Sequence, residues 1–234
     1  MADTPPKKNI EHAVSTPNRS PRASIATLYP AVFLSGGVVM VLELMGTRII
    51  APFYGNGLVV WTALISVTLV ALAAGYLIGG WAADRWEARG LNVVLLLAAL
   101  FVLLIAPAHA LVLDWSESFG IRLGALISAT VLFLPPLFLL GMVAPNAVRL
   151  AGTQLHTIGS VAGTLYAVST IGSVLGTLSL GFLLFPLFGS ADILLASAIV
   201  LVICGLLVTR RFAWMVLVLV ALNGFGVPVS YTHL

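Results

Sequence analysis

Charged residues are scarce in this chain. Only 8% of its 234 residues are Asp, Glu, Lys or Arg, whereas 60% are hydrophobic. A soluble domain normally carries about 25% charged residues, so this chain has too little polar surface to cover a water-soluble fold of its length. The mean hydropathy of +1.12 agrees with this. The composition therefore indicates a protein that lies largely in lipid.

Cysteine is almost absent, since Cys204 is the only one. It cannot form an intrachain disulfide, and it has no second thiol with which to hold a metal. Catalytic patterns are lacking too: Gly55-x-Gly57 and Gly224-x-Gly226 miss the third glycine of a dinucleotide site, and no serine lies in a nucleophile elbow. We therefore expect no catalytic constellation, metal site or cofactor in these residues.

Basic residues outnumber acidic ones, 11 against 8, which gives a pI near 9.4. This excess does not predict nucleic-acid binding, because the basic residues lie at the ends of apolar segments and in the N-terminal tail. The tail, residues 1–25, combines prolines, Ser and Thr with four basic residues and has no apolar period. It is predicted to be disordered and does not resemble a cleavable signal peptide.

Seven apolar segments follow and define a predicted transmembrane domain over residues 26–228. A helix rises about 1.5 Å per residue, so about 20 residues cross a bilayer core of about 30 Å. Backbone groups in lipid must bond within the segment, so each is predicted to be helical. The predicted fold class is all-α, a polytopic bundle of about seven helices. The spans are 28–50, 57–82, 91–113, 121–149, 159–188, 191–209 and 212–228.

The Lys and Arg residues predict the orientation of these spans. With the N-terminus in the cytoplasm, nine of them lie on the cytoplasmic side and only Arg48 and Arg122 on the far side, which is the expected bias. The nine are Lys7, Lys8, Arg19, Arg22, Arg85, Arg89, Arg149, Arg210 and Arg211. Residues 229–234 then follow the last span without a charged stop. We expect a truncation point or non-native residues there, with a genuine short exterior tail as the alternative.

Glycines at helical spacing predict close contacts between helices. Gly75 and Gly79 form one small-xxx-small face, with Gly80 beside them, and Gly172 and Gly176 form another. The span that carries the second pair is predicted to be the central packing helix, with a substrate path along it as the less favoured alternative. Asp84 and Arg85 are expected to cap the cytoplasmic end of the second span.

Two further local features concern helix ends and bends. Pro135-Pro136 lies inside the fourth predicted span and is expected to kink it, either as a hinge or, more in keeping with the pattern, as a fixed bend. Tyr54-Gly55-Asn56-Gly57 is a turn signal between the first two spans. Asp192 is predicted to be the N-cap of the sixth.

Glu43 is an acidic residue inside the first predicted span, about seven residues or ~10 Å from its outer end. An ionisable group at that depth is costly unless it is paired or hydrated, so it marks a candidate functional site. Arg48 can extend to the interface. Trp61, His109 and Asn223 fall in the outer halves of their spans, and the five together form the candidate polar intramembrane site. The alternative is a structural bond from Glu43 to a neighbouring helix.

Four spaced motifs carry a resemblance to a known family. They are ELMGTRIIAPFYG at 43–55, GYLIGGWAADR at 75–85, LGMVAPNAVRL at 140–150 and GTLYAVSTIGSVLGT at 163–177. In this order they resemble the N-terminal membrane region of membrane-bound spermidine-synthase-like proteins, over about residues 30–190. The second motif also partly resembles the loop after the second helix of major-facilitator transporters, although Glu87 stands where those proteins have a glycine.

In the spermidine-synthase-like family, membrane helices precede a soluble, Rossmann-like domain. That domain transfers an aminopropyl group from decarboxylated S-adenosylmethionine to putrescine. Its cofactor loop and acidic catalytic residues have no counterpart in these 234 residues, so the resemblance implies this activity for the parent protein and not for this chain. It further implies a multi-pass domain of a bacterial inner membrane, with the bilayer, a C-terminal synthase domain and a polyamine as partners.

Two other functions stay open at this point. One is a stand-alone transporter-like module for a small cation or polyamine, with Glu43 as the counter-charge. The other is a membrane scaffold with a purely structural role. Loss of ligand binding on removal of the Glu43 charge would favour the first, and weaker folding with normal function would favour the second.

Overall fold

The computed structural model describes residues 25–86, 89–152 and 158–208. Six helical spans in this part of the chain are long and apolar enough to cross a membrane. The predicted all-α, multi-pass membrane fold is therefore confirmed. The predicted tail up to residue 24, the predicted seventh span 212–228 and the candidate residue Asn223 lie outside the described residues.

The helices follow the predicted spans closely and mostly extend them by a few residues. Two of the six spans are composite, because α4 continues into α5, and α6 continues through a π-helical turn into α7. The elements are α1 (Ile25–Tyr54), α2 (Leu58–Trp86), α3 (Arg89–Glu117), α4 (Gly120–Gly141), α5 (Val143–Ala151), α6 (Ile158–Ser179), η2 (Leu180–Leu184), α7 (Phe185–Leu187) and α8 (Ser190–Val208).

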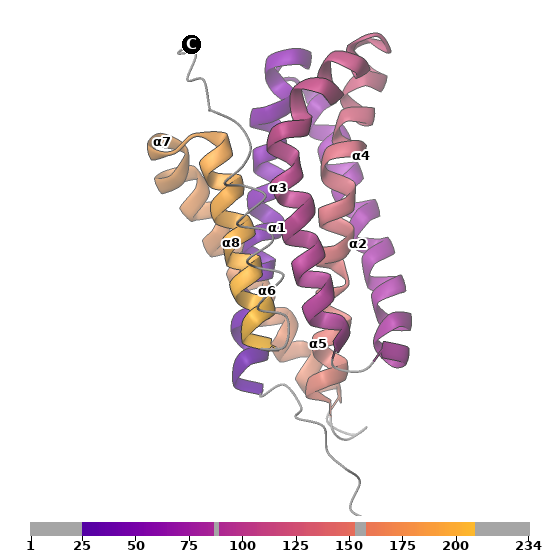
Figure 1. Ribbon diagram of the computed structural model, residues 1–234, viewed down its shortest axis with the longest axis vertical. Helices are drawn as coiled ribbons and strands as arrows, with labels where there is room; N and C mark the ends of the chain where they lie inside the picture. The colour runs from indigo at the N-terminus through magenta and orange to yellow at the C-terminus, as the bar shows by residue number, and fades with distance from the viewer. Residues whose placement is uncertain (1–24, 87–88, 153–157, 209–234) are drawn as a thin grey trace, which may run out of the picture.

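Short turns join the spans at the end of the bundle that is uppermost in Figure 1. The predicted turn after α1 contains Gly55 with φ +82°, a conformation that glycine adopts without strain. The N-cap prediction for Asp192 is wrong by position: α8 begins at Ser190, and the Asp192 carboxylate accepts a hydrogen bond from the backbone N–H of Gly189 at 3.3 Å. The residue acts from within the first turn, as the acidic residue of a capping box does.

The centre of the bundle is α1, which packs extensively against α4, α6 and α8 and also contacts α2. The span of α6 and α7 lies at the periphery and packs mainly on α1 (Figure 1). Only 11% of its most apolar stretch is buried, against 39–56% for the other five spans. The prediction of a central packing helix over 159–188 is therefore wrong. Gly172 and Gly176 lie on one side of α6, where it contacts α1 closely.

Two interfaces bring helix backbones close together. On α2, a Cβ added at Gly75 would overlap the carbonyl oxygen of Phe138 and lie 2.9 Å from Cα of Gly141 on α4. On α6, a Cβ added at Gly176 would lie 2.7 Å from the carbonyl oxygen of Gly37 on α1. Without large side chains between them, the backbones approach closely and gain packing contacts that lipid tails cannot replace.

The fourth span is interrupted after the proline pair. Helix α4 continues through Pro135 and Pro136 and ends at Gly141, and Met142 separates it from α5. Pro145 explains this position, because a proline lacks the N–H that would bond to the carbonyl four residues earlier, and its ring crowds that carbonyl. The Met142 carbonyl accepts two hydrogen bonds from Asn146, one from its side-chain amide at 2.7 Å and one from its backbone N–H at 3.4 Å.

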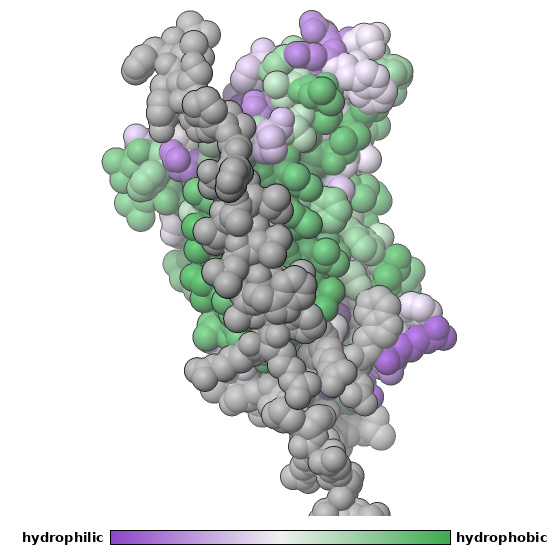
Figure 2. Space-filling view, viewed as in Figure 1, coloured by the Kyte–Doolittle hydropathy of each residue, from purple (hydrophilic) through white to green (hydrophobic). Residues whose placement is uncertain are grey.

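Polar and apolar surfaces are segregated along the bundle. Figure 2 shows hydrophobic residues over the middle of the visible face and hydrophilic residues at its two ends. Among the described charged side chains, Asp84, Arg85 and Arg149 lie at the lower end, opposite the turns, and Asp114, Glu117, Arg122 and Asp192 lie near the upper end. Glu43 departs from this distribution, because it lies well inside α1.

Candidate functional site

Glu43 lies on α1, eleven residues before the helix ends at Tyr54. At about 1.5 Å per residue this is about 16 Å from the end of the helix, compared with ~10 Å from the outer end of the predicted span. The side chain is half-buried. It therefore has one side against protein and one side open to whatever occupies the surface of the bundle.

The Glu43 carboxylate has no hydrogen-bond or ion-pair partner within residues 25–86, 89–152 and 158–208. Arg48, five residues further along α1, does not pair with Glu43, and the geometry of the helix explains why. Five residues turn an α-helix by about 140°, so the two side chains leave α1 in different directions. The alternative prediction was a structural bond from Glu43 to a neighbouring helix. The described part of the chain shows no such bond.

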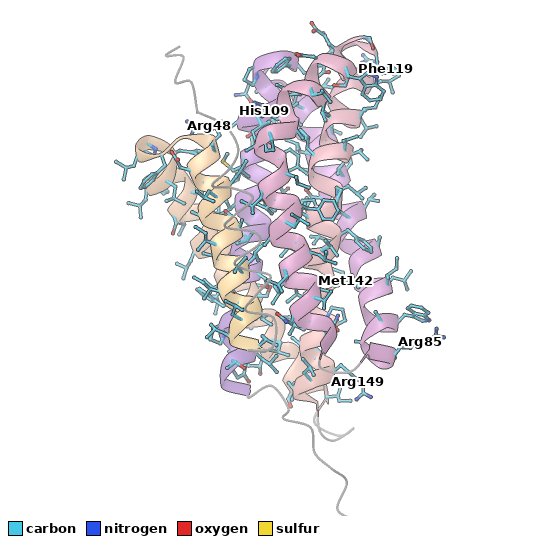
Figure 3. The ribbon with its side chains drawn as sticks, viewed as in Figure 1. Arg48, Arg85, His109, Phe119, Met142 and Arg149 are labelled. Carbon is cyan, nitrogen blue, oxygen red and sulfur yellow. The ribbon has the colours of Figure 1, made fainter. Side chains whose placement is uncertain are left out.

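Arg48 is engaged with α7 near the upper end of the bundle (Figure 3). Its Nη1 donates to the backbone carbonyl of Phe185 at 3.5 Å, and its Cζ lies 5.0 Å from the centre of the Phe185 ring. A guanidinium over an aromatic face is attracted by the ring quadrupole. Arg48 therefore joins α1 to α7 and does not pair with Glu43, which has no ion pair with any other described residue.

His109 and Trp61 form no hydrogen bond with Glu43 in the part of the chain that the structure describes. The Nδ1 atom of His109 lies 2.6 Å from the carbonyl oxygen of Ala106 in its own helix, and since a carbonyl only accepts, Nδ1 carries the proton. Trp61, near the start of α2, is 37% exposed. Among the described candidates, no hydrogen bond or ion pair joins any two of the predicted polar site.

The residues predicted for packing and capping have distinct surroundings. Gly75 and Gly79 face α4 and α5, and Gly172 and Gly176 face α1, all at close approach. Gly80 does not belong to this set, because a Cβ added there would meet no atom of the described part of the chain within 4 Å. At the lower end, Asp84 pairs with Arg149 at 3.4 Å. Arg85 instead stacks over Trp81, with its Cζ 4.1 Å from the ring centre.

Two buried polar features were not predicted. The hydroxyls of Tyr54, Ser116 and Ser128 form a chain with separations of 2.7 and 2.6 Å that connects α1, α3 and α4. Asn92 on α3 is fully buried, and neither the nitrogen nor the oxygen of its side-chain amide has a hydrogen-bond partner among the described residues. Isolated Ser, Tyr and Asn residues carry no spacing signal in the sequence, so only the packing of the helices reveals them.

Two cavities open on the described surface. One of about 240 Å³ lies between α1, α6 and α8 and is lined almost entirely by apolar residues around Gly37 and Gly176. The other, of about 310 Å³, lies at the lower end and is lined by Gly80, Asp84, Arg149 and Tyr166 among others. In the part of the chain that the structure describes, no three His, Cys, Asp or Glu side chains gather as metal ligands.

Comparisons with protein families, with curated proteins and with solved structures found no match for this chain. Its function is therefore inferred from the architecture and from the surroundings of individual side chains.

Proposed function

We propose that this chain is a multi-pass membrane module that binds a small organic cation through Glu43. The observation that carries the proposal is the half-buried Glu43 carboxylate, which has no partner among the described residues. An ionised carboxylate inside a membrane span is costly unless an opposite charge or water compensates it. A cationic ligand that enters from the open side of α1 would supply that charge.

An amine-bearing ligand suits this position better than a bare metal ion. A divalent ion requires several oxygen ligands, whereas one carboxylate can bind one ammonium group. The apolar surface beside Glu43 would contact the methylene groups of such a ligand. A polyamine, which alternates ammonium groups with short methylene chains, combines both properties.

The resemblance of residues 30–190 to the membrane region of spermidine-synthase-like proteins supports the same ligand class. In such a parent protein, the module would hold a polyamine in the membrane close to an aminopropyltransferase domain. The charge bias of the chain supports an N-terminus in the cytoplasm, and the resemblance implies a bacterial inner membrane. The lower end, with Arg85 and Arg149, would then face the cytoplasm.

The test is spermidine binding by the purified 234-residue chain in lipid nanodiscs, measured by isothermal titration calorimetry. Glu43→Gln keeps the shape of the side chain and removes its charge, so affinity should fall by about tenfold or more, or ~1.4 kcal/mol. Glu117→Gln is the matched control, because Glu117 is exposed at the end of α3, and it should bind as the unchanged chain does. Equal binding by the Glu43 variant and the unchanged chain would refute the proposal.

A scaffold role is the second candidate, and the exposure of the α6 span favours it. That span buries far less of its surface than the other five. It could therefore contact another membrane protein on its open side. In that case spermidine titrations of the unchanged chain and of Glu43→Gln would both show no binding. The chain would also co-purify with a defined membrane partner.

A further inference from the structure

A second polar site lies at the lower end of the bundle, near the C-terminal end of α2 and away from Glu43 on α1. There α2, α5 and α6 surround a cavity of about 310 Å³. Its lining combines the opposite charges of Asp84 and Arg149 with the phenol ring of Tyr166. Gly80 leaves the wall open, since a Cβ added there would meet no atom of the described residues within 4 Å. The cavity thus has both charge and room for a small zwitterionic group.

The Asp84–Arg149 ion pair in this cavity uses only part of the hydrogen-bonding capacity of the two side chains. Nε of Arg149 lies 3.4 Å from Oδ1 of Asp84, and the two side chains are 60% and 75% exposed. A guanidinium has five N–H donors and a carboxylate has two acceptor oxygens, so each partner keeps free bonding capacity. An exposed ion pair adds little to stability. The pair therefore presents a positive and a negative group side by side, at the mouth of a cavity.

Aromatic and basic side chains of the kind that gather at lipid headgroups lie on the helices around this cavity. Arg85 stacks over Trp81, and both Trp81 and Tyr166 are about half-exposed. Trp and Tyr gather where hydrocarbon gives way to headgroups, because their rings are apolar on one side and polar at the edge. Figure 3 shows Arg85 and Arg149 at the same end of the bundle.

We propose that this cavity binds the phosphoethanolamine headgroup of a membrane phospholipid. The phosphate accepts hydrogen bonds from the free N–H groups of Arg149, as guanidinium groups favour phosphate. The primary ammonium group donates to the free oxygen of Asp84. A phosphocholine headgroup carries the same charges but has no N–H to donate, so the site prefers the ethanolamine lipid. This site is independent of Glu43 and of any polyamine.

The test is native mass spectrometry of the delipidated 234-residue chain. Phosphatidylethanolamine, phosphatidylcholine and phosphatidylglycerol with identical acyl chains compete for it in equal amounts. The expected result is retention of the ethanolamine lipid over the choline lipid by about tenfold. Asp84→Asn should remove that preference, and Arg149→Gln should lower retention of both lipids. Arg122→Gln, at the opposite end, is the control and should change neither.

A second variant separates lipid binding from folding. Gly80→Leu extends into the open cavity, so it should fold normally and yet lower retention of the ethanolamine lipid. Equal retention of the ethanolamine and choline lipids by the unchanged chain would overturn the proposal. Preferential retention of phosphatidylglycerol would also overturn it, because it indicates a purely anionic ligand. Tighter binding of free phosphoethanolamine than of the intact lipid would overturn the assignment to a phospholipid.

Discussion

The hydroxyl of Tyr54 at the end of α1 lies 2.7 Å from the hydroxyl of Ser116 on α3. Ser116 lies in turn 2.6 Å from Ser128 on α4, and all three side chains are buried. Gly124 leaves the space that the Tyr54 ring occupies, since a Cβ there would lie 2.7 Å from it. Because buried hydroxyls lack water, this chain of hydrogen bonds satisfies them and joins three helices at the upper end.

Tyr54→Phe should lower the free energy of unfolding by about 0.5–1.5 kcal/mol, because it leaves Ser116 with one partner fewer in a buried place. The measurement is unfolding by SDS in mixed micelles, followed by circular dichroism. Ser118→Ala is the control, since the Ser118 hydroxyl bonds to the Trp115 carbonyl in an exposed position. Equal losses in the two variants would show that the buried network adds no stability.

Gly75→Leu should destabilise the α2–α4 interface by about 1–3 kcal/mol or more, because its side chain would collide with the α4 backbone at Phe138 and Gly141. The same SDS titration measures the effect. Gly80→Leu on the same helix is the matched control and should change the unfolding free energy little, since its surroundings are open. The close approach would be refuted if both variants unfolded alike.

Gly172→Val should weaken the attachment of α6 to α1. A side chain at Gly172 would overlap the carbonyl of Phe33, and it would pull apart the hydrogen bond from Ser173 to the Gly36 carbonyl, now 2.9 Å long. The melting temperature should fall by about 2–4 °C for each kcal/mol lost. Gly163 lies on the exposed side of α6, where an added Cβ meets no atom of the described residues within 4 Å, so Gly163→Val should melt as the unchanged chain does. A lower melting temperature for Gly163→Val alone would contradict this packing.

Single cysteines in a Cys204→Ser background should report the orientation in the membrane. Asn56→Cys, in the turn after α1, should react with a membrane-impermeant maleimide in intact cells. Arg85→Cys, at the opposite end, should react only after the cells are permeabilised. The reverse pattern would show that the N-terminus lies outside.

The membrane spans were predictable because the signal for them is local. About 20 apolar residues without charge must cross the bilayer as a helix, and a turn such as Tyr54–Gly57 separates one span from the next. The sequence predicted that Gly75 and Gly172 lie in close contacts between helices, since glycine spacing marks a face along one helix. The partner of each face was not predictable, because the sequence of one helix does not name the helix opposite.

The order of the helices within the bundle depended on tertiary structure. In lipid, a helix is apolar on every side, so its sequence has no polar face to separate surface from interior. The small-residue stripe of 163–177 therefore resembled a central helix, although α6 lies at the edge and α1 at the centre. In the same way, the break at Met142 depends on Pro145 within the packed α4–α5 span and not on the more conspicuous proline pair.

Glu43 stood out in the sequence because an acidic residue in an apolar span is rare, and that much follows from local chemistry alone. Its lack of a partner in the described residues, the contact of Arg48 with Phe185 and the pairing of Asp84 with Arg149 were decided by the tertiary structure. Hydrophobic length is a property of one segment, and it is enough to place each helix in the membrane. Pairing is a property of two segments far apart in the chain, and it exists only once the helices have packed.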